Sequence, residues 1–177
     1  QAEATGPARQ HFHYIDADKD GAITRAEYDA MAAIFNQSQN VCLAVRPGGR
    51  GDVTDTRVAW KQTRGLPYVP SPLCYEGRLY LVKNGGLASC FDAKTGEIHY
   101  LEERLGALGD YYASPVAGGG KLCVVSQQGV AVVWRAGDTL EVLARNALGE
   151  QVMATPAIVD ERLYLRTKGF LYAFGER

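Results

Sequence analysis

The sequence predicts a mainly β fold: a partial β-propeller of about three four-stranded antiparallel blades, preceded by an N-terminal helix-loop-helix of the EF-hand type. Two observations predict it. The stretch Ser71–Tyr100 consists of short apolar runs separated by turn residues, and its pattern returns twice at intervals of about 40 residues. Residues 16–27 carry the acidic spacing of a calcium-binding loop.

Ser71–Tyr100 is the template of the repeat. Its apolar residues predict three strands, around Leu79–Val82, over Leu87–Phe91 and over Ile98–Tyr100. Turn residues separate these strands, at Asn84-Gly85-Gly86 and at Lys94-Thr95-Gly96. A complete unit of the repeat has four such strand-like runs, which is the number of strands in a propeller blade.

The repeat also divides the chain. Ser71-Pro72 returns as Ser114-Pro115 and as Thr155-Pro156, and the strand that follows each pair returns with it. We therefore expect an EF-hand segment at residues 1–40, a partial blade at 41–67, complete blades at 68–110 and 111–150, and a partial blade at 151–177. The first partial blade is expected to lack its inner strands and the last its outer strand.

Composition excludes several classes of protein. Hydrophobic residues make up 46% of the chain and the formal net charge is -1, which is typical of a globular protein and gives no basic surface for nucleic acid. No apolar run is long enough to predict a membrane span. The start of the chain has no signal-peptide pattern, and the first residue, Gln1, leads us to expect a processed or truncated product.

The four cysteines form no CxxC pair. The repeat aligns Cys74 and Cys90 with apolar residues of other blades, namely Ala117 and Ile158 for the first and Val133 and Ala173 for the second. This predicts that both are buried free thiols that act as small hydrophobic side chains. Disulfides and metal binding are the alternatives.

The acidic loop is the most specific motif of the sequence. Carboxylates stand at loop positions 1, 3, 5 and 12, and a glycine, Gly21, allows the sharp bend at position 6. Ca²⁺ requires six to eight oxygen ligands, and this spacing directs several of them inward from one tightly curled loop. The predicted ligands are Asp16, Asp18, Asp20, Ala22 through its carbonyl, Thr24 and Glu27.

The residues around the loop support two helices. Phe12 and Ile15 share one face of the helix that enters the loop, and Tyr28 and Met31 share one face of the helix that leaves it. We find no second loop in the sequence, although EF-hands usually occur in pairs. We therefore favour a structural calcium site over a calcium sensor, with a solvated acidic turn as the alternative. The nearby His11 and His13 are expected to be surface residues.

The run from Phe91 to Tyr100, with Asp92, Thr95 and Gly96 in its turn, resembles the repeat of PQQ-like (quinoprotein alcohol dehydrogenase-like) β-propellers. Residues 134–139 keep a degraded form of the same run, and the resemblance covers residues 41–177. The combination with an EF-hand is similar to large propeller proteins of planctomycete-type bacteria. The resemblance implies a bacterial protein that works in the periplasm or outside the cell.

Enzymes of the PQQ-like family hold a quinone with a vicinal cysteine pair and with acidic residues that chelate calcium. The sequence has no adjacent cysteines and no catalytic aspartate that we can match, so we expect neither PQQ nor catalytic residues. Tyr111 and Tyr112, with Tyr68 in the matching place, could line a groove, and packing between blades is the other explanation.

These observations together predict a non-enzymatic, calcium-binding scaffold or protein-interaction module. Since few strands are present to close a ring, the chain is expected to be part of a larger propeller, completed by missing blades, or else by association as a homo-oligomer. A fragment of a PQQ-dependent dehydrogenase is the alternative function, and a propeller whose rim binds a protein partner is a third.

Overall fold

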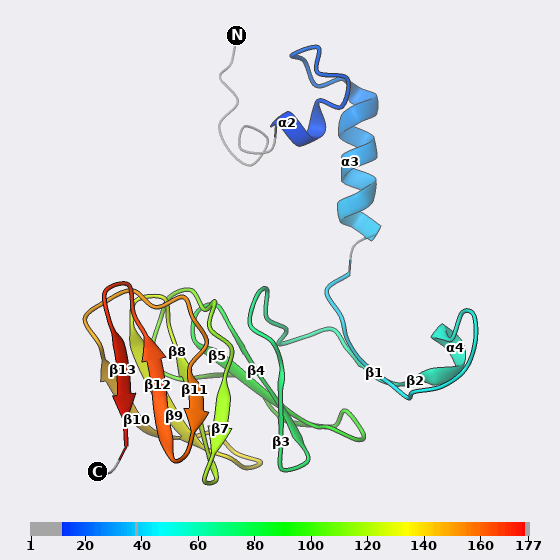
Figure 1. Cartoon of the computed structure of the whole chain (residues 1–177). Coiled ribbons are helices and arrows are strands. Elements are labelled where there is room, and N and C mark those ends of the chain that lie inside the picture. The colour runs from blue at the N-terminus through cyan, green and yellow to red at the C-terminus, as the bar shows by residue number, and fades with distance from the viewer. Residues whose placement is uncertain (1–11, 38, 176–177) are drawn as a thin grey trace. The chain divides into compact units, whose positions relative to one another are not determined.

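A computed structural model of the chain describes residues 12–37 and 39–175. The chain divides into two compact units, Gln1–Asn40 and Val41–Arg177 (Figure 1). The leader Gln1–Gly6 and His11 lie outside the described residues. None of the described helices has the length and apolar character needed to cross a membrane.

Over residues 12–37, the first unit contains a short helix, a loop and a longer helix. Helix α2 spans Phe12–Ile15 and helix α3 spans Arg25–Gln37. Phe12, Ile15 and Met31 are half-buried, whereas Tyr28 is 55% exposed.

The described part of the second unit, up to residue 175, is mainly β and contains four antiparallel sheets, which we number blades 0 to 3. Each sheet is a meander whose consecutive strands pair (Figure 1). Blade 0 comprises β1 (Cys42–Val45) and β2 (Val58–Gln62), and blade 1 comprises β3 (Leu73–Tyr75), β4 (Arg78–Lys83), β5 (Leu87–Asp92) and β6 (Ile98–Arg104). Blade 2 comprises β7 (Val116–Gly118), β8 (Lys121–Val125), β9 (Val130–Arg135) and β10 (Glu141–Ala147), and blade 3 comprises β11 (Ala157–Val159), β12 (Arg162–Arg166) and β13 (Leu171–Phe174).

The mainly β fold with propeller-like blades is confirmed, with two differences of detail. A first strand, β3, precedes the three strands predicted within Ser71–Tyr100, because a tight turn at Glu76-Gly77 folds Leu73–Tyr75 back onto β4. A short helix, α4 (Thr54–Arg57), lies between β1 and β2, within the segment expected to be a partial blade.

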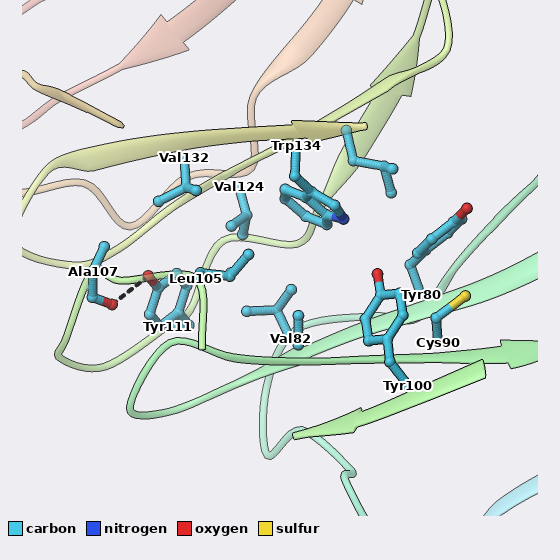
Figure 2. Packing of buried hydrophobic residues seen from close by; sticks show 12 residues of the cluster. Tyr80, Val82, Cys90, Tyr100, Leu105, Ala107, Tyr111, Val124, Val132 and Trp134 are labelled. Carbon is cyan, nitrogen blue, oxygen red and sulfur yellow. Dashed lines mark hydrogen bonds between the residues drawn. The ribbon is translucent and has the colours of Figure 1, made fainter. Parts of the chain in front are cut away.

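The blades stack through their sheet faces. Strand β7, the first strand of blade 2, contacts β3 and β11, the first strands of the blades on either side, as expected when sheets radiate from a shared centre. Side chains of blades 1 and 2 form the largest core cluster, which includes Tyr80, Tyr100 and Trp134 (Figure 2). Smaller clusters lie between blades 0 and 1 and between blades 2 and 3.

Cys74 and Cys90, both predicted to be buried, differ in their exposure to solvent. Cys90 is buried between blades 1 and 2, as predicted, and its burial raises the pKa of the thiol to about 12. Cys74 is exposed, so the prediction that it is buried is wrong. The reason is its direction: Tyr75 faces blade 2, so Cys74 faces blade 0, whose described part has no inner strand to cover it.

Tyr68, Tyr111 and Tyr112 also differ in their exposure to solvent. Tyr111 is buried in the core between blades 1 and 2, where its hydroxyl donates to the carbonyl of Ala107 at 2.7 Å (Figure 2). Tyr112 is partly exposed and Tyr68 is 94% exposed. Packing between blades therefore explains Tyr111, while Tyr68 has no such role in the described chain.

Candidate functional site

The candidate site is the loop between α2 and α3. The amide of Asp16 closes the last turn of α2 by donating to the carbonyl of Phe12, and the carbonyl of Thr24 accepts from Tyr28 in the first turn of α3. Between them the backbone turns at Lys19 and Gly21, both with positive φ, which glycine adopts without steric cost. The two helices thus fix the ends of a tightly curled loop.

Three of the predicted ligands come together. One carboxylate oxygen each of Asp16, Asp18 and Glu27 lies within 4.8 Å of the others. Asp16 is buried, and its two oxygens accept from the amides of Asp20 and Gly21 at 3.1 Å each. The spacing of these acidic residues in the sequence therefore brings their carboxylates together at one point.

Glu27 reaches back across the loop from α3. Its Oε1 accepts from the amide of Ala17 at 2.8 Å, and its Oε2 accepts from both the amide and the hydroxyl of Thr24 at 2.8 Å. The hydrogen bond from the Thr24 amide, followed by that from the Thr24 hydroxyl, lowers the pKa of the Glu27 carboxyl. Glu27 is thereby held as an anion in a fixed orientation.

The other three predicted ligands lie around this group. Asp20 accepts from the amide of Ala22 at 2.8 Å through Oδ1, and its carboxylate is not among the three that converge within 4.8 Å. Thr24 is hydrogen-bonded to Glu27, and coordination by the Ala22 carbonyl and by Thr24 stays a prediction. Three anions held this close repel one another unless a cation lies between them, and oxygen donors of this kind suit Ca²⁺.

The propeller repeat carries a second polar motif, and its role is structural. Asp92 Oδ1 accepts from the amides of Lys94 and Thr95 and from the Thr95 hydroxyl, all within 2.9 Å. These bonds close the turn between β5 and β6, and Gly96 completes it with a φ of 76°. Asp92 and Thr95 therefore stabilise the turn through hydrogen bonds to the local backbone.

One cluster of ionisable groups in blades 1 and 2 was not predicted. Arg78 Nε and His99 Nδ1 both contact Asp138 Oδ1, at 2.7 Å and 3.2 Å. The hydrogen bond from Arg78 lowers the pKa of the Asp138 carboxyl. The cluster links two blades, and the only sequence signal for it was Asp138 in the degraded copy of the repeat turn.

Most of the chain matches one protein-family model. A family model described as "Outer membrane protein assembly factor BamB" matches residues 52–176. The chain belongs to this PQQ-like/BamB repeat family. No match is found among curated proteins.

Solved structures agree on the fold of this BamB family. BamB from Moraxella catarrhalis is similar with a TM-score of 0.54 at 16% identity, over 67% of this chain and 36% of that protein. The computationally designed Ika4 protein is similar with a TM-score of 0.57 at 13% identity, over 78% of this chain and 86% of that one. The chain thus spans about a third of the length of that BamB and is a partial propeller.

Proposed function

We propose that the chain is a non-enzymatic, calcium-binding scaffold or protein-interaction module that forms part of a larger propeller. The observation that carries the calcium proposal is the convergence of Asp16, Asp18 and Glu27 within 4.8 Å. Membership of a family named for an assembly factor supports the interaction role. The same membership supports a site of action in the periplasm or outside the cell.

The structural role of the metal follows from the loop. Hydrogen bonds within the loop already orient Asp16 and Glu27, so a bound Ca²⁺ would hold α2 and α3 together at little cost in chain ordering. A single loop of this kind stabilises its own helix pair. We therefore propose a static calcium clip, not a sensor.

Isothermal titration calorimetry of the 177-residue chain with CaCl2 tests the proposal. We expect saturable binding below millimolar concentration and a loss of at least about tenfold in affinity in Glu27→Gln, which removes one anionic ligand. Asp29→Asn is the matched control, because Asp29 lies on the same helix and pairs with Arg25 outside the group. Absence of binding, or equal binding by wild type and Glu27→Gln, would refute the calcium site.

A pull-down with the tagged chain tests the interaction role separately. We expect it to recover a defined protein partner or the missing part of the propeller. Recovery of the chain alone would count against an interaction module.

A further inference from the structure

The joint between blades 1 and 2, the packed space between their sheets, is bounded by a complete four-stranded sheet on each side. Tyr80 and Tyr100 each lie opposite Cys90 on a neighbouring strand of blade 1, and all three share one buried cluster with Trp134 of blade 2 (Figure 2). Trp134 is fully buried, and Tyr100 is 4% exposed. Polar atoms in this joint can therefore be paired only with one another, with the backbone or with buried water.

Two tyrosines of the joint are paired with the backbone of blade 2. The hydroxyl of Tyr80 accepts from the amide of Gly137 at 3.0 Å. The hydroxyl of Tyr75 accepts from the amide of Gly120 at 3.1 Å. Both hydroxyls thus enter an apolar cluster without losing their hydrogen bonds.

Tyr100 and Trp134 are the exceptions. Tyr100 Oη and Trp134 Nε1 are both buried, and neither has a hydrogen-bond partner among residues 12–37 and 39–175. Burial raises the pKa of Tyr100, and the nearby indole N–H of Trp134 acts in the opposite direction. Figure 2 shows the Tyr100 hydroxyl directed toward the Trp134 indole. Two unpaired polar groups therefore lie near each other in one apolar joint.

The joint between blades 0 and 1 solves the same position differently. There Trp60 holds the place of Tyr100, since the pairing of β1 with β2 and that of β5 with β6 shift register beside the equivalent residue. Trp60 Nε1 donates directly to the carbonyl of Ala93 in the next blade, at 3.2 Å. The Tyr100 hydroxyl makes no such bond to blade 2.

We propose that one buried water molecule bridges Trp134 Nε1 and Tyr100 Oη and so links blades 1 and 2. The indole N–H can only donate, whereas a tyrosine hydroxyl can donate or accept, so a water oxygen between them can bond to both. Fixing one water costs less free energy than burying two polar groups without partners. The water thus replaces the direct bond that Trp60 makes in the preceding joint.

The carbonyl of Gly137 is the third partner of this water. Cys90, the cross-strand neighbour of Tyr100, lies with its Sγ 3.9 Å from the Gly137 oxygen, so this carbonyl faces the same row of side chains. A thiol is a weak donor, and a carbonyl oxygen has two lone pairs, so the oxygen can also accept from water. Buried waters make about three hydrogen bonds, which is the number available here.

Water–protein NOESY and ROESY spectra of the ¹⁵N-labelled 177-residue chain test the site. We expect a cross-peak between water and the Trp134 indole proton with opposite signs in the two spectra, as a bound water gives. The chain has two tryptophans, so Trp60→Phe assigns the remaining indole signal to Trp134. Absence of the cross-peak would overturn the proposal.

Tyr100→Phe distinguishes a water from the hydroxyl itself. If Trp134 bonded directly to Tyr100, a hydroxyl proton that exchanges with solvent could produce the same cross-peak. In Tyr100→Phe the water keeps Trp134 and Gly137 as partners, so the cross-peak should persist. Its loss in a folded variant would indicate the direct bond and overturn the proposal.

A crystal structure of the unmodified chain, at a resolution that shows ordered waters, is the second measurement. Electron density within hydrogen-bond distance of both Trp134 Nε1 and Tyr100 Oη would support the proposal. Direct contact between these two atoms, or two atoms with no density between them, would overturn it. The outcome does not depend on Ca²⁺ or on further blades, because both sheets of this joint are complete.

Discussion

The amide of Ser71 donates to the hydroxyl of Ser114 at 2.9 Å, which links the start of blade 1 to the start of blade 2. The contact recurs at the next blade, where the amide of Ser114 donates to Thr155 Oγ1, also at 2.9 Å. Each hydroxyl precedes a proline of the repeat. The recurrence of Ser-Pro and Thr-Pro therefore has a physical cause. The hydroxyls of Ser114 and Thr155 each accept a hydrogen bond from the amide of the equivalent residue one blade earlier.

This relationship predicts that Ser114→Ala destabilises the chain. The change removes the acceptor for the Ser71 amide, and we expect the free energy of unfolding to fall by about 1 kcal/mol. Urea unfolding followed by circular dichroism measures it. Ser71→Ala is the matched control, since the Ser71 hydroxyl has no hydrogen-bond partner among residues 39–175, and it should cost clearly less. Equal losses would contradict the inter-blade role.

A second prediction concerns the contact of Gly96 with Trp60. The Trp60 ring lies over the β5–β6 turn, with Nε1 donating to the carbonyl of Ala93 at 3.2 Å. A Cβ at Gly96 would lie 2.7 Å from ring atoms of Trp60, and its φ of 76° is unfavourable for alanine. Gly96→Ala should therefore cost about 2–4 kcal/mol of unfolding free energy.

Gly77→Ala separates the two causes. Gly77 has a similar φ of 75°, but a Cβ added there would have no other atom within 4 Å, so only backbone strain of about 1 kcal/mol is expected. Thermal and urea unfolding of both variants give the comparison. If Gly77→Ala costs as much as Gly96→Ala, packing by Trp60 contributes little.

The sequence predicted the blades better than the surroundings of individual side chains. Period and turn residues located β4, β5 and β6, because each blade repeats the same local hydrogen bonding. Exposure of Cys74 could not be predicted from its own repeat, since it depends on which strands of blade 0 lie opposite. Tertiary surroundings, not local pattern, decide such positions.

The loop shows the same limit. Its spacing predicted that carboxylates gather, and Asp16, Asp18 and Glu27 do so. It could not predict that the Asp20 carboxylate would accept the amide of Ala22, because that choice depends on the local backbone direction. Residue spacing defines the candidates, whereas hydrogen bonds define their orientation.

A third prediction concerns the turn of blade 3. Asp160 and Glu161 have φ values of 47° and 62°, and both carry side chains, whereas the equivalent turn of blade 2 uses Gly119 and Gly120. Glu161→Gly should relieve strain and raise the free energy of unfolding by about 0.5–1 kcal/mol. The reverse change, Gly120→Glu, should lower it. A stability loss in Glu161→Gly, measured by urea unfolding, would contradict this account.

A fourth prediction uses pH to test the link between blades 2 and 3. Glu150 Oε2 accepts from the hydroxyl of Thr167 and, at 3.0 Å, from the amide of Gly169. The Thr167 hydrogen bond, followed by that of Gly169, lowers the pKa of Glu150 below its ordinary value of 4.5. Since the folded pKa is below the unfolded one, this stabilisation is present above about pH 4.5 and is lost as the pH falls through the folded value.

Urea unfolding of wild type and Glu150→Gln between pH 7 and pH 3 measures this contribution. The stability difference between the two proteins should stay constant above about pH 5 and shrink at lower pH, because wild-type Glu150 becomes protonated and then resembles the amide. Thr167→Val removes the first donor to Glu150 and should weaken this pH dependence. If the stability difference does not change with pH, the charge of Glu150 does not stabilise the contact between blades 2 and 3.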